Sequence, residues 1–206
     1  MNQQRDLEGI SALVTGATSG IGRAAAEELG RHGAEVVVHG RDIARGSAVV
    51  DTIAAEGGKA RFVAADLTDP NQLDGLVDQA GPVDVLAPKM AVRGSGCIIN
   101  VASMAGQIGL AGGAAYGATK ATLAAMTRAW AAEFSPSGVR VNAIAAGPVL
   151  TPGAAPERIE ALGAMTLLSR AAQPSEIAEI LAFLASPKAS YVTGAVIAAD
   201  GGRTAV

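Results

Sequence analysis

Three side chains in the middle of the sequence have types and a spacing suited to proton transfer: Ser103, Tyr116 and Lys120. Tyr116 and Lys120 stand four residues apart in a segment with a helical pattern, so we expect their side chains on one face of a helix. A free tyrosine has a pKa of about 10, and a neighbouring ammonium favours the phenolate and lowers that pKa. Tyr116 is therefore a candidate general acid or base. The alternative interpretation is an ordinary contact on a helix surface.

Ser103 precedes Tyr116 by thirteen residues and follows an apolar run at 97–101 that predicts a buried strand. Open parallel α/β sheets bind their ligands at the carboxyl ends of the strands. A hydroxyl in that place can donate a hydrogen bond to a substrate oxygen and polarise a carbonyl. Taken alone, Ser103 is equally explained as a loop or cap residue.

The elements that would position these residues are predicted from β-branched runs that alternate with Ala/Leu-rich segments, a pattern typical of βαβ units. Low-complexity tails, internal repeats and Pro/Ser-rich linkers are absent, so we expect one domain over residues 1–206. The predicted fold class is α/β, a doubly wound parallel sheet with helices on both faces. The sequence predicts strands at 10–15, 35–39, 60–64, 83–86, 97–101, 139–144 and 195–199, and helices at 21–32, 42–56, 70–80, 115–135 and 174–185.

The segment VTGATSGIG, residues 14–22, leaves the first predicted strand and enters the first predicted helix. Its three glycines allow a tight turn and a close approach of the backbone, and the first N–H groups of the helix face the turn. This arrangement suits the pyrophosphate of a dinucleotide. The spacing G-x-x-x-G-x-G differs from the commonest fingerprint, G-x-G-x-x-G, and a purely structural turn would have a similar sequence.

The glycine loop resembles the cofactor loop of the short-chain dehydrogenase/reductase family, in particular that of its 3-oxoacyl-reductase-like members. Further motifs of this family follow in the same order along the chain. The likeness covers nearly the whole chain. The other motifs are AADLTD with Asp66, the pair INVAS (ending at Ser103) and YGATK (Tyr116 to Lys120), AGPVLT at 146–151, and SYVTGAVIAADGG at 190–202. The resemblance implies a Rossmann-like oxidoreductase that uses NAD(P)(H) to reduce a carbonyl or oxidise a secondary alcohol of a small organic substrate by hydride transfer.

The resemblance also implies roles for individual residues. Ser103, Tyr116 and Lys120 would be catalytic, and Lys120 would also hydrogen-bond the nicotinamide ribose. Asp66 would approach the adenine, and the segment 146–151 would lie beside the nicotinamide. A homo-oligomer, tetramer or dimer, is the family's habit. The residues implied to contact the cofactor are Gly16, Thr18, Ser19, Gly20, Ile21, Gly22, Arg41, Asp66, Leu67, Tyr116, Lys120, Val149 and Thr151.

The end of the second predicted strand bears on the choice of cofactor. NAD-preferring members of the family usually place an acidic residue there, which accepts from the ribose hydroxyls. This chain has Gly40 followed by Arg41, and a guanidinium can bind a 2′-phosphate bidentately. We therefore favour NADP(H). The alternative is NAD(H), with Arg41 a solvated loop residue. Asp42 is interpreted as the N-cap of the next helix.

Composition excludes several other classes of function. A net charge of −3, a sequence pI near 5.4 and only 3% aromatic residues argue against a nucleic-acid or anionic-membrane partner. The single cysteine, Cys97, lies in an apolar run and is interpreted as a buried hydrophobe. No cluster with ligand spacing indicates a metal site, and His32 and His39 are interpreted as structural. The N-terminus lacks the features of a secretory signal, so we expect a cytoplasmic protein.

Two departures from the family's pattern concern catalysis. Ala146 stands where the family usually has proline, and the N-N-A-G segment after the fourth strand is absent, together with the family's helix asparagine. These departures leave open a second hypothesis, a cofactor-binding member that senses or scaffolds without catalysis. The segment 151–170, rich in Pro, Gly and Ala at its start, is the predicted mobile lid.

The connection between the predicted strands at 83–86 and 97–101 is unusually short. A βαβ crossover needs at least roughly ten to twelve residues, its helix included, and the ten residues 87–96 are at the lower limit of that length. The segment APKMAVRGSG looks like the last turn of the family's long helix and the loop after it. We therefore predict that some forty residues are missing between Leu86 and Ala87. A disordered segment skipped by the numbering is favoured over a true deletion, which would expose the apolar face of the sheet.

Overall fold

The computed structural model describes residues 5–80 and 87–206 of the chain. The contacts divide the chain into two compact units. The first comprises the residues up to 85 together with 178–182, and the second comprises 86–177 together with 183–206. Each unit contains three parallel strands. A single domain over residues 1–206 stays a prediction.

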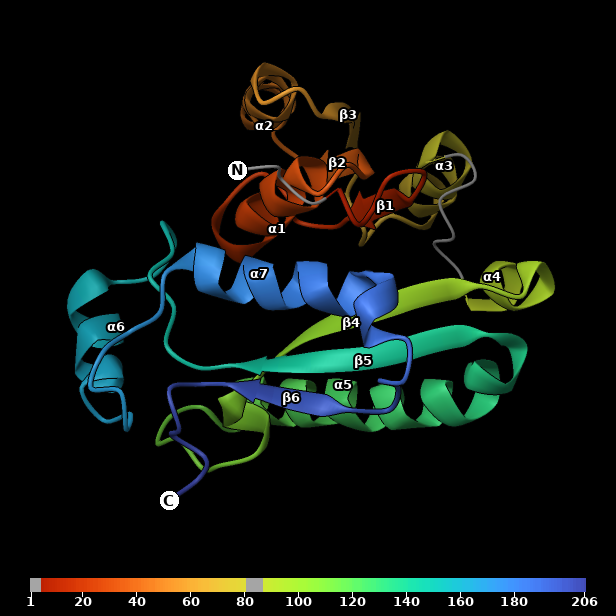
Figure 1. Cartoon of the computed structure of the whole chain (residues 1–206). Coiled ribbons are helices and arrows are strands. Elements are labelled where there is room, and N and C mark those ends of the chain that lie inside the picture. The colour runs from red at the N-terminus through yellow and green to blue at the C-terminus, as the bar shows by residue number, and fades with distance from the viewer. Residues whose placement is uncertain (1–4, 81–86) are drawn as a thin grey trace. The chain divides into compact units, whose positions relative to one another are not determined.

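The first unit is a parallel sheet in the order β1-β2-β3. Its strands are β1 (Ser11–Val14), β2 (Glu35–Gly40) and β3 (Lys59–Ala64), and its helices are α1 (Gly20–Arg31), α2 (Ile43–Ala55) and α3 (Pro70–Ala80) (Figure 1). The helices cover both faces of the sheet. Phe62 of β3 fills the space over Gly46 of α2, whereas its neighbour Val63 packs with Leu76 of α3. Successive side chains of a strand point to opposite faces, so α2 and α3 lie on opposite sides.

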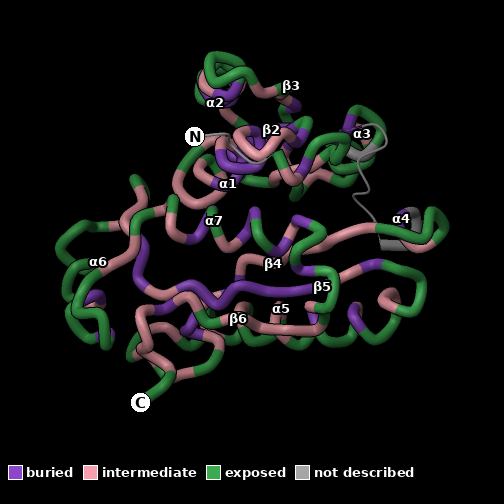
Figure 2. Tube along the Cα trace, viewed as in Figure 1, coloured by how far each residue is buried: buried purple, intermediate pink, exposed green. Residues whose placement is uncertain are grey.

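Strand β2 forms the centre of this unit's core. Val36, Val37 and Val38 are completely buried, as the purple trace of β2 in Figure 2 shows. The strand is paired on both edges and covered on both faces, which explains the continuous β-branched run in its sequence.

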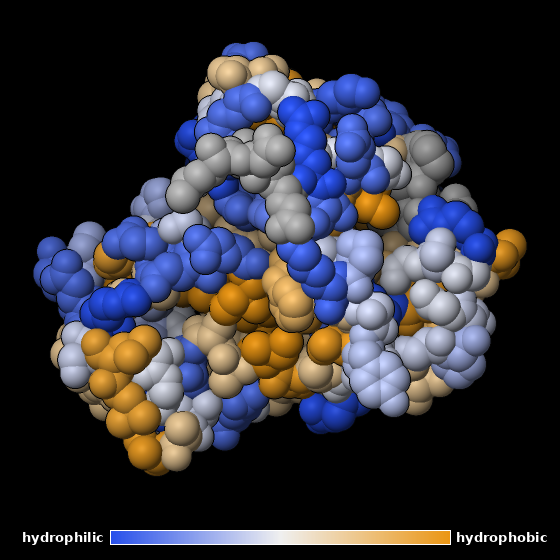
Figure 3. Space-filling model, in the orientation of Figure 1, coloured by the Kyte–Doolittle hydropathy of each residue, from blue (hydrophilic) through white to orange (hydrophobic). Residues whose placement is uncertain are grey.

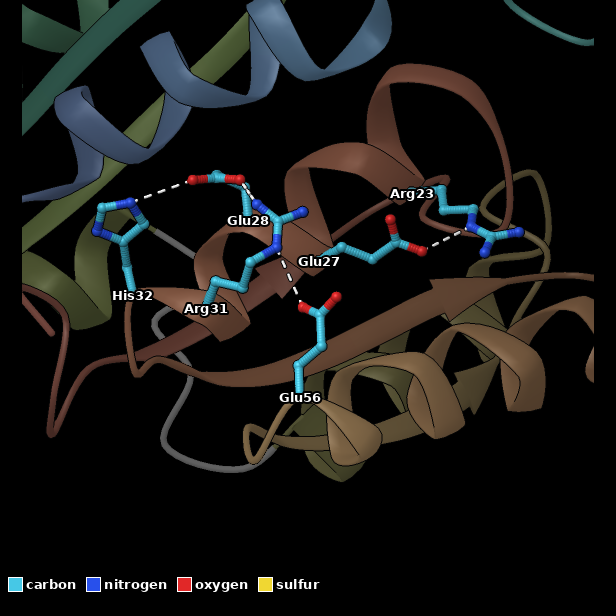
Figure 4. A network of polar contacts seen from close by, with 6 residues as sticks. All are labelled: Arg23, Glu27, Glu28, Arg31, His32 and Glu56. Carbon is cyan, nitrogen blue, oxygen red and sulfur yellow. Dashed lines mark hydrogen bonds and ion pairs between the residues drawn. The ribbon is translucent and has the colours of Figure 1, made fainter. Parts of the chain in front are cut away.

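Charged residues link α1 to α2 on the surface of the first unit (Figure 4). The guanidinium of Arg31 contacts Glu28 and, through Nε at 3.0 Å, Glu56 at the end of α2. Glu28 is largely buried and also lies 3.2 Å from Nε2 of His32, the C-cap of α1. A separate pair, Arg23 with Glu27, lies one turn earlier on α1 at 2.7 Å. The end of α1 is therefore held by compensated charges rather than by apolar packing alone.

The second unit is a parallel sheet in the order β4-β5-β6, and β5 is its buried central strand (Figure 2). The strands are β4 (Gly96–Ser103), β5 (Val139–Ala146) and β6 (Val196–Ala199), and the helices are α4 (Ala87–Arg93), α5 (Ala114–Phe134) and α6 (Pro156–Gly163). Helix α7 (Pro174–Ala185) begins and ends in this unit, whereas its residues 178–182 belong to the first unit. On one face, Asn100 of β4 donates to Thr127 of α5 at 2.9 Å. On the other, the thiol of Cys97 donates to the carbonyl of Leu184 in α7 at 3.4 Å.

The predicted α/β class with parallel strands is confirmed, and each element predicted within the described residues lies within about two residues of its observed bounds. The prediction omitted α6 and gave α4 only as the remnant of a longer helix. The predicted strand at 83–86 and the predicted gap between Leu86 and Ala87 fall on a junction outside the described residues. Of the helices that the structure describes, none has the length and apolar character needed to cross a bilayer.

Candidate active site

The glycine loop of the first unit makes the tight turn that its sequence predicts. Gly16 and Gly20 have φ values of 67° and 55°, a region that side chains other than glycine rarely adopt. A Cβ atom on Gly22 would lie 2.3 Å from the carbonyl oxygen of Gly16, so the turn can close only around a glycine. Ser19 is the N-cap of α1, but its side chain makes no capping hydrogen bond. The first N–H groups of α1 are therefore not capped by this side chain and can receive an anion.

Three further residues implied to contact the cofactor lie at the carboxyl ends of β2 and β3. Asp66 follows β3, and its carboxylate accepts hydrogen bonds from the backbone N–H and the hydroxyl of Thr68, at 3.0 and 2.8 Å. These bonds, and more weakly the positive charge of Arg41, hold the pKa of Asp66 below its usual value. Arg41 and Leu67 are exposed. The first unit thus keeps an ionised carboxylate and a guanidinium at one edge of its sheet.

In the second unit, two glycines bring the turn after β4 against α5. A Cβ on Gly106 would lie 2.8 Å from the backbone N of Ala121, and one on Gly117 would lie 2.6 Å from the carbonyl oxygen of Ala105. Any larger residue would separate the two segments. Ser103 begins this turn, and its Oγ accepts a hydrogen bond from the N–H of Ala105 at 3.2 Å. With that acceptor role filled, the hydroxyl proton of Ser103 is free to donate.

Tyr116 and Lys120 lie on the same face of α5, as their spacing predicts. Nζ of Lys120 lies 5.6 Å from the centroid of the Tyr116 ring, within the range of a cation–π contact. The same ammonium donates a hydrogen bond to the carbonyl of Val101 at 2.9 Å, two residues before Ser103. The Tyr116 side chain is exposed, and within the described part of the chain its hydroxyl has no hydrogen-bond partner. Lys120 thus connects the end of β4 to the tyrosine, whose hydroxyl is open to a substrate.

The segment after β5 holds the other two residues implied to contact the cofactor. Val149 is buried and forms an isolated parallel bridge with Ala172, and the neighbouring Leu150 N–H donates to the Ala172 carbonyl at 2.9 Å. Thr151 lies on the wall of an open hollow of about 260 Å³, whose lining is otherwise apolar: Leu150, Pro152, Ala154, Pro156 and Ile159. Despite the alanine at 146, β5 stays paired with β4 and β6 through this residue.

His39 takes part in positioning the glycine loop, a role that the sequence interpretation missed. Its side chain is 3% exposed. Nδ1 accepts from the N–H of Gly16 at 3.4 Å, and Nε2 lies 3.1 Å from the carbonyl oxygen of Ala65. Because an N–H can only donate and a carbonyl can only accept, these two contacts match the tautomer with its proton on Nε2. One buried side chain therefore links the carboxyl ends of all three strands of the first unit. The available signal was a polar residue ending an apolar strand.

Other candidates for chemistry lead to no site. Burial raises the pKa of the Cys97 thiol, so this group is not an activated nucleophile. In residues 5–80 and 87–206, no group of three or more His, Cys, Asp or Glu side chains could hold a metal ion. The two sets of predicted site residues lie in different units: the glycine loop, Arg41, Asp66 and Leu67 in the first, and Ser103, Tyr116, Lys120, Val149 and Thr151 in the second.

Comparison with known families gives matches along the chain. A model described as "short chain dehydrogenase" matches residues 11–88, and a model described as "Enoyl-(Acyl carrier protein) reductase" matches residues 82–204. The chain is 38% identical to cis-4-hydroxycyclohexanecarboxylate dehydrogenase of Sinomonas cyclohexanicum, covering 95% of this chain and 96% of that one. It is 34% identical to cyclopentanol dehydrogenase of Comamonas testosteroni, covering 94% and 96%.

Solved structures show the same fold. A short-chain type dehydrogenase/reductase from Mycobacterium marinum has a TM-score of 0.89 and 30% identity, covering 99% of each chain. Two other neighbours contain a cofactor. An NAD(P)-dependent gluconate 5-dehydrogenase structure from Beutenbergia cavernae has bound NADP (TM-score 0.86, 33% identity, 98% and 100% covered). A 3-oxoacyl-[acyl-carrier protein] reductase from Brucella melitensis has bound NAD (TM-score 0.88, 25% identity, 98% and 94% covered). The predicted Rossmann-like fold is confirmed.

The comparisons also bear on the predicted missing segment. The alignment with the Sinomonas protein extends over 242 positions, whereas 95% of this chain of 206 residues is about 196, so about 46 positions have no residue of this chain opposite them. The two family matches meet at 82–88, the stretch that contains the Leu86–Ala87 junction. The alignment length shows that this chain is shorter than the Sinomonas relative, whereas the location of the missing residues between Leu86 and Ala87 stays a prediction.

Proposed function

Because this chain belongs to the short-chain dehydrogenase/reductase family of oxidoreductases, we propose that it transfers hydride between a nicotinamide cofactor and the carbinol carbon of a small secondary alcohol or its ketone. Tyr116 is the general acid and base in this proposal, and NADP(H) is the preferred cofactor. The observation that carries the proposal is the contact of the Ser103 turn with α5, because it brings a hydroxyl donor to the helix that bears Tyr116 and Lys120.

Each residue of the second unit has a distinct part. Ser103 donates its hydroxyl proton to the substrate oxygen and orients it. The Lys120 ammonium lies over the tyrosine ring and favours the phenolate, so that Tyr116 can take a proton from an alcohol or return it to a ketone. The bond from Lys120 to the Val101 carbonyl fixes the ammonium in this place. These groups manage the proton, while the bound nicotinamide accepts or donates the hydride.

The first unit fits a dinucleotide. The N-terminus of α1 has no side-chain cap, and the tight turn at Gly16 and Gly22 leaves the backbone accessible to a pyrophosphate. Arg41 is exposed at the end of β2 and forms no ion pair with the residues that the structure describes, so its guanidinium can bind a 2′-phosphate. No acidic residue occupies that strand end to repel the phosphate. These features support NADP(H), with NAD(H) the alternative.

An alicyclic secondary alcohol is the substrate class that we propose to test first. Two relatives are named for a hydroxycyclohexane carboxylate and for cyclopentanol. The hollow beside Thr151 offers mainly apolar walls, which suit a saturated ring that carries one hydroxyl. Figure 3 shows further apolar surface around α6, where Met165, Leu167 and Leu168 are exposed.

The test is reduction of NADP⁺ and of NAD⁺, followed at 340 nm, with cyclohexanol, cyclopentanol and 4-hydroxycyclohexanecarboxylate, and the reverse reaction with the ketones. We expect turnover of at least one alcohol, faster with NADP⁺, and its loss in Tyr116→Phe. Cofactor binding without turnover of any secondary alcohol or ketone would overturn the catalytic proposal. Light scattering on the same samples tests the predicted homo-oligomer.

A second function, cofactor binding without catalysis, is favoured by one observation. About 46 alignment positions of the Sinomonas relative have no counterpart here, and by resemblance the missing stretch carries the helix asparagine. If the 206-residue chain is the complete natural protein, its site lacks that group. The intact mass of the protein from its natural source decides this point. A mass of 20.4 kDa would show a true deletion, whereas a larger mass would show an additional segment.

A further inference from the structure

The end of β2 and the glycine loop are fitted to each other in the first unit. The carbonyl of His39 accepts a hydrogen bond from the N–H of Ala17 at 2.8 Å. The next residue along the strand, Gly40, is buried, and its carbonyl accepts from the N–H of Ala65 at 3.2 Å. The strand end is therefore fixed on two sides by backbone hydrogen bonds, and it cannot withdraw from the loop without breaking one of them.

Thr18 occupies the space that a side chain at position 40 would need. A Cβ atom on Gly40 would lie 2.4 Å from Cγ2 of Thr18, 3.1 Å from its Oγ1 and 3.3 Å from its Cβ. The φ angle of Gly40 lies outside the left-handed region, so the backbone itself would accept another residue. The requirement for glycine is therefore one of space alone. Thr18 is β-branched and stiff about χ1, which limits how far it can turn aside.

We propose that Thr18 is a specificity-determining residue, which acts by preventing the chain from presenting a carboxylate at the end of β2. An acidic side chain at position 40 would accept from the ribose hydroxyls of NAD(H) and repel a 2′-phosphate. While Thr18 fills that space, the first side chain available at the strand end is Arg41. The inference rests on the proposed function, because it assumes a bound nicotinamide dinucleotide. It adds that cofactor choice depends on a pair of positions, 18 and 40, which must change together.

The first test measures the size match itself, without any cofactor. Gly40→Ala adds one methyl group, and we expect it to lower the melting temperature by about 3–10 °C, as overpacking does in a domain of this size. Thr18→Ala removes the two nearest atoms, so the same Gly40→Ala change in that background should cost less than half as much. The matched control is Gly75→Ala in α3, where a Cβ meets only Gln79 Nε2 at 3.8 Å. That control should raise the melting temperature slightly. A harmless Gly40→Ala, or equal losses in both backgrounds, would overturn the inference.

The second test measures the dissociation constants of NADPH and NADH by titration calorimetry. Gly40→Asp alone should weaken both cofactors at least tenfold, because the displaced Thr18 distorts the loop. Thr18→Ala combined with Gly40→Asp should restore NADH binding at least tenfold over the single variant, while NADPH stays weak. Equal NADH affinities in the single and double variants, with normal NADPH binding in the unmodified protein, would overturn this inference alone. Failure of the unmodified protein to bind either cofactor would overturn the proposed function, and the inference with it.

Discussion

Predicted site residues stand at the carboxyl ends of β2 and β4, where Arg41 follows β2 and Ser103 ends β4. The two strands differ in how deeply their residues are buried. In β2 the three valines before His39 are fully buried, and the strand is paired on both edges. In β4 every residue except Ala102 is partly exposed, and β5 is its one partner among the described strands. The unit that resembles a cofactor-binding module is thus closed around its central strand, whereas the catalytic residues follow an edge strand.

The predicted missing segment lies next to the less buried of these two strands. Strand β4 and the short helix α4 come directly after the junction at 81–86, where the two family matches meet. By resemblance, a long helix would end there, so the predicted missing segment concerns the second unit, which carries Ser103, Tyr116 and Lys120. We therefore expect changes in the first unit to act on cofactor binding, and changes in the second to show whether turnover exists.

Tyr116→Phe gives the largest expected effect and tests whether the second unit is catalytic. If the second unit is catalytic, this change removes only the transferable proton, and kcat should fall by about 10²–10⁴-fold. Cofactor affinity, measured by NADPH fluorescence, should change little. Tyr191→Phe is the matched control, since Tyr191 is fully exposed and outside the proposed site. Near-normal turnover in Tyr116→Phe would remove the catalytic assignment from the second unit.

Lys120→Ala should affect both chemistry and cofactor binding. The change removes the ammonium over the tyrosine ring and the hydrogen bond to the Val101 carbonyl. One charge-assisted interaction contributes about 1.5–3 kcal/mol, so kcat/KM should fall by about ten- to a hundredfold. A fall in kcat alone, with an unchanged dissociation constant for NADPH, would contradict a role of Lys120 in cofactor binding.

Arg41→Ala sharpens the assignment of the first unit. Only NADPH carries the 2′-phosphate, so its dissociation constant should rise by about ten- to a hundredfold while that of NADH changes little. Arg45→Ala is the matched control, because Arg45 lies on α2 and is already paired with Asp42 at 2.8 Å. Equal losses for both cofactors in Arg41→Ala would contradict the preference for NADP(H).

Substitutions of His39 test whether this one buried side chain holds the glycine loop in place. His39→Leu removes both side-chain hydrogen bonds, so we expect about 1–3 kcal/mol less stability and about tenfold weaker cofactor binding. His39→Gln retains one acceptor and one donor and should recover much of the affinity. Val37→Ala is the control for stability alone, because Val37 is fully buried and packs toward α3. If Val37→Ala weakens cofactor binding as much as His39→Leu, the loop depends on general stability instead.

Local patterns in the sequence were sufficient to predict most of the fold. The run Val36–Val38 has the composition of a central parallel strand, and the Ala-rich stretch around Tyr116 has helical spacing, so both elements were found. Helix α6 was missed because its eight residues follow a segment rich in Pro and Gly, although Pro156 at its start is a helix signal.

The tertiary features of the site were beyond prediction. The bond from His39 to Gly16 joins residues 23 apart, and the space of Gly40 is filled by a side chain from another loop. Such contacts depend on how strand ends meet in space, which no period in the sequence records. The choice of Tyr116 and Lys120 depended on family resemblance rather than on spacing, because the same spacing is common on helix surfaces.

The smallest predicted effect concerns an ion pair in the second unit, which is compared with an ion pair in the first. In the second unit, Arg170 makes two hydrogen bonds to Glu176, at 2.8 and 2.6 Å, and Glu176 also accepts from the N–H of Gln173 at the start of α7. The Arg170 bonds are the main cause that lowers the Glu176 pKa to about 2. A carboxylate whose folded-state pKa is lowered stabilises the fold above its unfolded pKa, and this stabilisation is lost as the pH falls through the folded value.

Glu176→Gln should therefore lower the melting temperature by about 1–3 °C at pH 7, since an exposed ion pair contributes at most about 1 kcal/mol. The difference from the unmodified protein should shrink as the pH falls from about 4.5 toward about 2. Glu56→Gln, which breaks the contact of Arg31 across α1 and α2 in the first unit (Figure 4), is the comparison variant. A Glu176→Gln difference that persists at pH 2 would mean that the carboxylate acts through packing and not through its charge.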